Sequence, residues 1–180
     1  MFLKSFLIFI PFLSLFSCQD LKKKKQINEI VRSEKTIQQI QKNIQSQNND
    51  AFVEILYRSK EVQSRIKQNY HSDTLNKDLG NQLNDYTFMI KKIDFSIKQY
   101  NHLVKEVEKE KTTLVNLKKD IETEAGDRSK YDEAIQFEEK KVKKLEQILD
   151  EIRKSQKESL ETFHRLHSEL ATFANNLNIK

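Results

Sequence analysis

The amino-acid sequence predicts an all-α protein made of elongated antiparallel helical hairpins, and three observations lead to this fold class. The 180 residues include two Gly and one Pro, so the residues that build the tight turns of a sheet are scarce. Apolar residues recur at alternating spacings of four and three over long stretches, which is the heptad pattern of coiled-coil helices. Charged residues make up 33% of the chain, as expected for helices with solvated outer faces.

Residues 1–17 have the features of a lipoprotein signal peptide. Lys4 supplies a positive end, and the apolar stretch after it has about a dozen residues, fewer than the roughly 20 that a membrane-spanning helix needs. The stretch ends in Leu15-Phe16-Ser17-Cys18, which resembles a bacterial lipobox. The resemblance implies that Cys18 becomes the lipid-modified first residue of the mature chain. An ordinary secretion signal and an uncleaved anchor are the alternatives.

Residues 18–25 are then expected to form a lipidated cysteine followed by a basic tether. Acyl chains on Cys18 would bind the chain to membrane lipid, because each buried methylene contributes about 0.8 kcal/mol. Lys22, Lys23, Lys24 and Lys25 would lie against anionic headgroups, each contributing about 1 kcal/mol. The alternative is a solvated spacer whose like charges repel one another.

Residues 26–72 are expected to form a short helical hairpin. Its first helix is marked by Ile27, Ile30, Ile37, Ile40 and Ile44. Residues 48–50 suit a turn that also caps the second helix. That second helix is marked by Phe52, Ile55, Leu56, Val62 and Ile66. Residues 72–74 then suit the cap of the helix that follows.

Residues 73–180 are expected to form a long antiparallel coiled-coil hairpin. The first apolar seam consists of Leu79, Leu83, Tyr86, Ile90, Ile93, Ile97, Tyr100, Val104, Val107, Leu114 and Ile121. The second seam consists of Tyr131, Ile135, Val142, Leu145, Leu149, Ile152, Phe163, Leu166, Leu170, Phe173 and Leu177. Gly126 lies between the seams and suits the left-handed residue that ends a helix.

The two seams also predict a register for this hairpin. Apolar residues face apolar residues along most of its length if Tyr86 lies opposite Leu170. The same register sets Lys118 against Glu138 in a charge-matched layer.

Phe88 and Phe95 occupy positions of the long helix that point away from its predicted partner helix, where polar residues are expected. We interpret them as core residues that the short hairpin covers. This interpretation gives a four-helix base from residues 26–97 and 158–180, and a protruding two-helix stalk from residues 98–157. The competing interpretation is that both aromatic residues are exposed anchors for a ligand.

One edge of the predicted stalk carries apolar residues on an otherwise polar surface. These are Leu103, Leu117, Ala134 and Ile148. They share one side of an antiparallel pair, which indicates a docking strip for another copy of the chain or for a partner helix. The alternative is that a long stalk tolerates scattered apolar residues, so self-association and a protein partner are both open.

The sequence offers no arrangement of residues for catalysis, so we expect neither enzyme activity nor a cofactor. The lone cysteine is assigned to lipidation, and the two glycines are too isolated for a phosphate-binding loop. Glu161, His164 and His167 have the spacing of a helical metal site, but the second copy that such sites need is missing, and no metal is predicted. The net charge of +5 is concentrated in the N-terminal lysines, which argues against a nucleic-acid partner.

The lipobox-like residues 15–18, a composition rich in Asn, Ile, Lys and Gln, and a helical mature chain together resemble the small envelope lipoproteins of spirochaetes of the Borrelia type. The resemblance implies a membrane-anchored protein, displayed on the outer membrane, that binds host proteins. A Bacteroidetes lipoprotein is an alternative. We therefore predict a non-enzymatic, adhesin-like or other protein-interaction lipoprotein of the cell envelope. The alternative function is a periplasm-facing chaperone or structural spacer.

Overall fold

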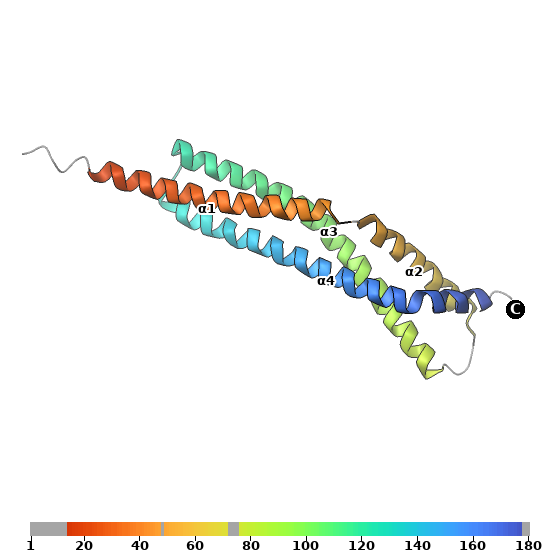
Figure 1. Cartoon of the computed structure of the whole chain (residues 1–180). Helices are drawn as coiled ribbons and strands as arrows, with labels where there is room; N and C mark the ends of the chain where they lie inside the picture. The colour runs from red at the N-terminus through yellow and green to blue at the C-terminus, as the bar shows by residue number, and fades with distance from the viewer. Residues whose placement is uncertain (1–13, 48, 72–75, 178–180) are drawn as a thin grey trace, which may run out of the picture. The chain divides into compact units, whose positions relative to one another are not determined.

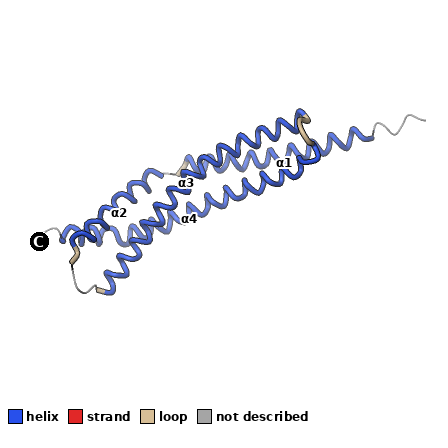
Figure 2. Tube along the Cα trace, turned by 180° about the vertical axis from the view of Figure 1, so that it is seen from behind, coloured by secondary structure: helices blue, strands red, loops and turns tan. Residues whose placement is uncertain are grey.

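The computed structural model describes residues 14–47, 49–71 and 76–177, with side chains from Asp20 onward. All regular structure in these ranges is helical, which confirms the predicted all-α class (Figure 2). The elements are α1 (Ser14–Gln45), α2 (Asn49–Asn69), α3 (Lys77–Thr123), a short 3-10 helix η1 (Arg128–Lys130) and α4 (Tyr131–Leu177). The predicted cap at residues 72–74 lies outside the described residues. The Asn76 side chain instead accepts a hydrogen bond from the backbone N–H of Asp78, at 2.8 Å.

The hairpin of α3 and α4 forms, but its register differs from the predicted one by about one helical turn. The Ser96 and Ser155 hydroxyls lie 2.7 Å apart, and such short side chains meet only where the two backbones are level. In agreement, the Tyr86 hydroxyl lies 2.6 Å from Nδ1 of His167, whereas the apolar seams predicted Leu170 opposite Tyr86.

The turn between the two helices explains this shift. The Tyr131 hydroxyl donates to the backbone carbonyl of Asp120 at 3.0 Å and also contacts the carbonyl of Ala125, so the start of α4 is held against the end of α3. The resulting register places Gln156 and Ser159 in the interior, with 6% and 1% of their surface exposed. Both positions continue the apolar seam of α4, so the core accepts polar side chains at two of its layers.

The chain divides into two compact units, and α3 and α4 each contribute to both. Of the described residues, unit 1 contains 14–38 and 108–143, and unit 2 contains those of 39–107 and 144–177. In unit 1, α1 lies beside the end of α3 and the start of α4 (Figure 1). In unit 2, α2 packs on the other parts of the two long helices.

Helix α1 covers a surface that the predicted bare stalk would have left open. Its apolar stripe is fully buried at Ile30 and Ile37, which expose 1% and 0% of their surface. Lys118 pairs with Glu34 of α1 at 3.2 Å, and not with Glu138 as the predicted register required. The expected bare stalk is therefore wrong, because the isoleucine stripe of α1 finds its apolar partner on the long hairpin.

Helix α2 belongs to a different unit from most of α1, so the expected short hairpin of residues 26–72 does not form the predicted four-helix base. The core of unit 2 is built from α2, α3 and α4, with Val62, Ile66, Tyr86, Met89, Ile90, Ile93, Phe163, Leu166, Leu170 and Ala174 buried together. Lys60 and Gln63 of α2 bond Asp94 and Thr87 of α3 at 3.0 and 2.7 Å.

Candidate functional site

The α3–α4 turn is a strained loop that gathers charged side chains. Gly126 has φ +82°, the left-handed conformation that its sequence position predicted. Glu124 also has a positive φ, +58°, which is uncommon for a residue with a side chain. Asp127 caps η1 by accepting the backbone N–H of Ser129 at 3.0 Å. This backbone points the Glu124 carboxylate toward two cations.

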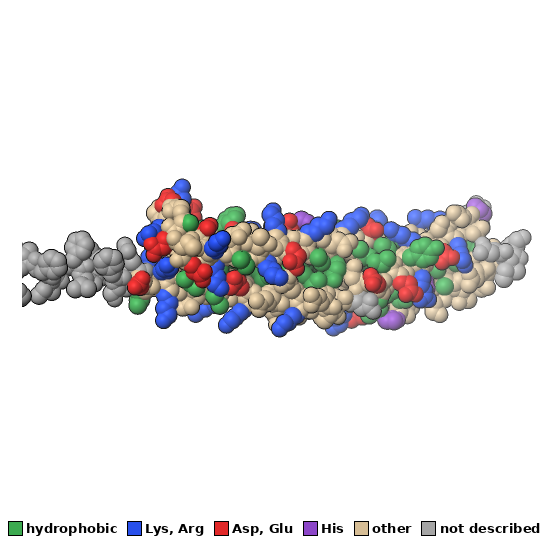
Figure 3. All heavy atoms as spheres, turned by 90° about the horizontal axis from the view of Figure 1, so that it is seen from above, with side chains coloured by type: hydrophobic (Ala, Val, Ile, Leu, Met, Phe, Trp, Pro, Cys, Tyr) green, Lys and Arg blue, Asp and Glu red, His purple; other side chains and the backbone are tan. Residues whose placement is uncertain are grey.

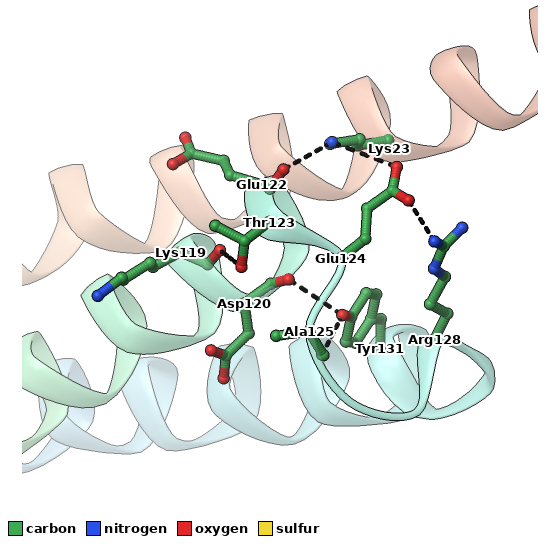
Figure 4. Close-up of polar contacts among 9 residues, drawn as sticks. All are labelled: Lys23, Lys119, Asp120, Glu122, Thr123, Glu124, Ala125, Arg128 and Tyr131. Atoms are coloured by element: carbon green, nitrogen blue, oxygen red, sulfur yellow. Dashed lines mark hydrogen bonds and ion pairs between the residues drawn. The ribbon is translucent and has the colours of Figure 1, made fainter.

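Those cations come from α1 and from η1 (Figure 4). The Lys23 ammonium donates to the Glu122 carbonyl at 2.7 Å and lies 3.4 Å from the Glu124 carboxylate, which also pairs with Arg128. The residue before it on α1 also reaches the turn: the Lys22 ammonium lies 2.9 Å from the Asp132 carboxylate. We call Lys22, Lys23, Glu124, Arg128 and Asp132 the turn cluster.

The residue that anchors this contact is Gln26, which is 5% exposed and donates to Asp132 at 2.6 Å. Hydrogen bonds from Gln26 and Lys22 lower the pKa of Asp132 below its ordinary value, because they stabilise the carboxylate. Beside these bonds lies a hollow of about 270 Å³, whose lining includes Lys22, Lys23, Glu124 and Arg128 and the apolar Ile121 and Tyr131. The site is open, cationic on balance and partly apolar.

The predicted basic tether, residues 22–25, is helical and part of α1. Lys22 and Lys23 contact the turn, Lys25 lies 3.8 Å from Glu29 on its own helix, and Lys24 is exposed. Cys18 falls within the backbone of α1, and its side chain lies outside the described residues. Most of the predicted signal peptide, residues 1–13, lies outside them as well. Of the described helices, none combines the length and the apolar character required to cross a bilayer.

The predicted docking strip is not an open surface. Leu103 is 1% exposed, and Leu117, Ala134 and Ile148 are half-buried. Leu103 is therefore unavailable to a separate partner molecule.

Phe88 and Phe95 are 66% and 60% exposed, so their interpretation as core residues is wrong. On α2, Val53 and Tyr57 are 46% and 71% exposed, and their spacing puts them on the same side as Lys60. Lys60 pairs with Asp94, the residue before Phe95, so α2 and α3 run side by side at this level and each exposes large side chains there. We call Val53, Tyr57, Phe88 and Phe95 the aromatic face.

Sequence reasoning missed the α2 half of this face, although a signal was present. Val53 and Tyr57 fall off the apolar stripe that the second helix uses for its core, so their spacing already marked them as outward-facing. Figure 3 shows that apolar side chains lie among charged ones on the surface of the molecule.

The histidine pair is used for packing. His167 stacks on Phe163 with ring centroids 4.3 Å apart and bonds Tyr86, while His164 is exposed. Within the described ranges, no group of three or more His, Cys, Asp or Glu side chains is placed to hold a metal ion.

One charge cluster lies between α3 and α4 and is buried at Glu110. Glu110 is 2% exposed and lies 2.5 Å from Lys141, which in turn lies 2.6 Å from Glu138. Burial raises the pKa of Glu110, and the ion pair with Lys141 opposes that effect. Two carboxylates thus share the single Lys141 ammonium, and we assign the cluster to packing between α3 and α4.

Comparison with known proteins finds no relative: no family model, no curated protein and no solved structure matches this chain.

Proposed function

We propose that this protein is a non-enzymatic, lipid-anchored protein of the bacterial cell envelope that binds another protein through its aromatic face. The observation that carries the proposal is the exposure of Tyr57, Phe88 and Phe95, each above half of its surface. Aromatic side chains of this kind supply most of the energy of protein–protein contacts, because each buries about 150–250 Å² when covered. Large aromatic side chains that the core does not use and that lie at the surface indicate a binding surface.

The anchor in this proposal is an acylated Cys18, inferred from the lipobox-like residues 15–18. Radioactive palmitate should label the protein in its native host and in a bacterial expression strain. Cys18→Ala should abolish the label and release the protein from membranes. A label that persists in Cys18→Ala would contradict the anchor.

The aromatic face is tested by site-specific photo-crosslinking in intact cells. A photoreactive residue at position 88 or 95 should give one discrete adduct of higher mass, whereas the same residue at exposed position 151 of α4 should give none. Phe95→Ser should weaken the adduct formed from position 88. Equal adducts from all three positions would indicate random collision and contradict the proposal.

The proposal has two forms, a surface-displayed protein that binds host molecules and a periplasm-facing chaperone or spacer. The aromatic face is compatible with both forms, since a chaperone also binds apolar segments of its client protein. Protease treatment of intact cells separates them: the surface form is degraded, and the periplasmic form survives until the outer membrane is permeabilised.

A further inference from the structure

We propose that the hollow beside the turn cluster binds the phosphate of a phospholipid headgroup in the membrane that holds the protein. This inference rests on the proposed acylation of Cys18. It adds a specific lipid contact by the folded domain, made by residues of α1 and of the α3–α4 turn together. The ligand is an anionic phosphate group with an apolar neighbour, as in a phosphatidylglycerol headgroup.

The position of the hollow along α1 supports this ligand. Helix α1 is continuous from Ser14, so Lys22 and Lys23 follow Cys18 by one turn, at most about 6–8 Å along the axis. The headgroup layer on each side of a bilayer is about 5–8 Å thick. Acyl chains attached at Cys18 would therefore hold the two lysines, and the turn that they contact, at the depth of the phosphates.

The charges of the hollow suit a phosphate. The hollow is lined by three cations, Lys22, Lys23 and Arg128, of which Lys23 and Arg128 share the Glu124 carboxylate and Lys22 pairs with Asp132, so one positive charge is in excess. The existing ion pairs are between side chains that are at least 30% exposed, and such pairs are weak. A phosphate oxygen can replace the Glu124 carboxylate between Lys23 and Arg128, because Arg in particular binds phosphate through two parallel hydrogen bonds.

Apolar groups next to the cations fit the same ligand. Leu21 lies between Cys18 and Lys22 and is 74% exposed, the most exposed of the large apolar side chains described. If Cys18 is acylated, the Leu21 side chain lies next to the bilayer and can insert into it. Ile121 and Tyr131 give the hollow an apolar part that glycerol and the first acyl carbons can contact.

The test uses the acylated full-length protein with a fluorophore on Lys130→Cys, beside the turn. Acylation blocks Cys18, so the dye labels only the new cysteine. The protein is inserted into phosphatidylcholine vesicles, phosphatidylglycerol is titrated in, and the half-saturating mole fraction is read from the fluorescence. A dye on Ser64→Cys of unit 2, also exposed, is the control position and should not respond.

Charge variants then identify the site. Lys23→Gln or Arg128→Gln should raise the half-saturating fraction about fivefold each. Lys154→Gln, which removes the same charge from an exposed position of α4, should leave it unchanged within about twofold. Glu124→Gln should lower it, because the competing carboxylate is gone. A merely structural role of Glu124 would give the opposite sign.

The possible failures can be told apart. A protein that takes up no palmitate contradicts the proposed function. An acylated, vesicle-bound protein whose dye at position 130 ignores phosphatidylglycerol, or responds equally in Arg128→Gln and Lys154→Gln, overturns this inference alone. If inorganic phosphate shifts the dye in detergent and phosphatidylglycerol does not, the ligand is a free anion and the headgroup assignment is wrong.

Discussion

His167 and Tyr86 show how single residues of the core combine polar and apolar roles. Tyr86 is 1% exposed, and its hydroxyl finds a partner in the imidazole of His167, which lies on the ring of Phe163. Burial and the nearby charge of Arg58 lower the pKa of His167. The neutral imidazole is therefore the form that the fold prefers.

This preference predicts a pH dependence. Because the pKa of His167 is lower in the folded than in the unfolded chain, the unfolded chain takes up more protons below about pH 6.5, and stability falls as the pH drops through that value. His167→Gln should cost about 1 kcal/mol at neutral pH and flatten the profile between about pH 7 and 5. Urea unfolding across this range measures both effects. His164→Gln, at an exposed site, should keep the wild-type slope.

The turn gives a second prediction for a single residue. Gly126 has φ +82°, and a Cβ there would meet no atom within 4 Å. Gly126→Ala should therefore cost about 1 kcal/mol through backbone strain alone. Gly126→Asn should cost less, since Asn tolerates this conformation. Equal midpoints of urea unfolding for all three proteins would contradict the argument.

At the scale of helices, the sequence predicted the two long elements and their turn, and it did not predict their partners. The heptad seams located α3 and α4, and Gly126 located the break between them. The register was missed because the seams were aligned by matching apolar residues, whereas the structure sets Ser96 level with Ser155. The placement of α1 was missed because an apolar stripe indicates that a helix packs against another element but does not identify that element.

The candidate sites were predictable in the same partial way. The lysines at 22 and 23 were singled out, but their partners Asp132 and Glu124 lie about 100 residues away in the sequence, and no local pattern joins them. The docking strip was expected to meet a partner helix, and one of its members, Leu103, proves to be buried within the chain's own fold.

The register of α3 and α4 can be tested directly. With Cys18 replaced by Ala, Ser96→Cys combined with Ser155→Cys should form a disulfide readily, because the two hydroxyls are 2.7 Å apart. Ser96→Cys combined with Leu160→Cys, the level pair in the register predicted from the seams, should remain reduced. Mobility on a non-reducing gel shows which pair has formed a disulfide. Cross-linking of the second pair alone would support the register predicted from the seams and contradict the observed one.

For the molecule as a whole, the core of unit 2 and the aromatic face are made of different residues. The core of unit 2 is complete without the aromatic face, whose residues lie outside the buried cluster. These residues do not stabilise the core, and they expose large side chains. They can therefore change without loss of the fold.

The corresponding prediction compares two kinds of variant. Phe88→Ser with Phe95→Ser should change the free energy of unfolding by no more than about 0.5 kcal/mol and abolish partner binding. Ile93→Ala, at a position 1% exposed, should cost about 2–5 kcal/mol. A large loss of stability in the double Phe variant would show that the face belongs to the core.

The contacts of α1 have a consequence for how the newly made chain reaches its final form. Gln26 and Asp132 are 106 residues apart, and Lys23 and Glu122 are 99 apart, so α1 has no docking surface until most of the polypeptide has been synthesised. Contacts this distant in sequence are slow to form because a long loop must close first. The isoleucine stripe of α1 therefore stays uncovered in the nascent chain. It is covered only when α3 and α4, the last two long helices to be synthesised, are complete.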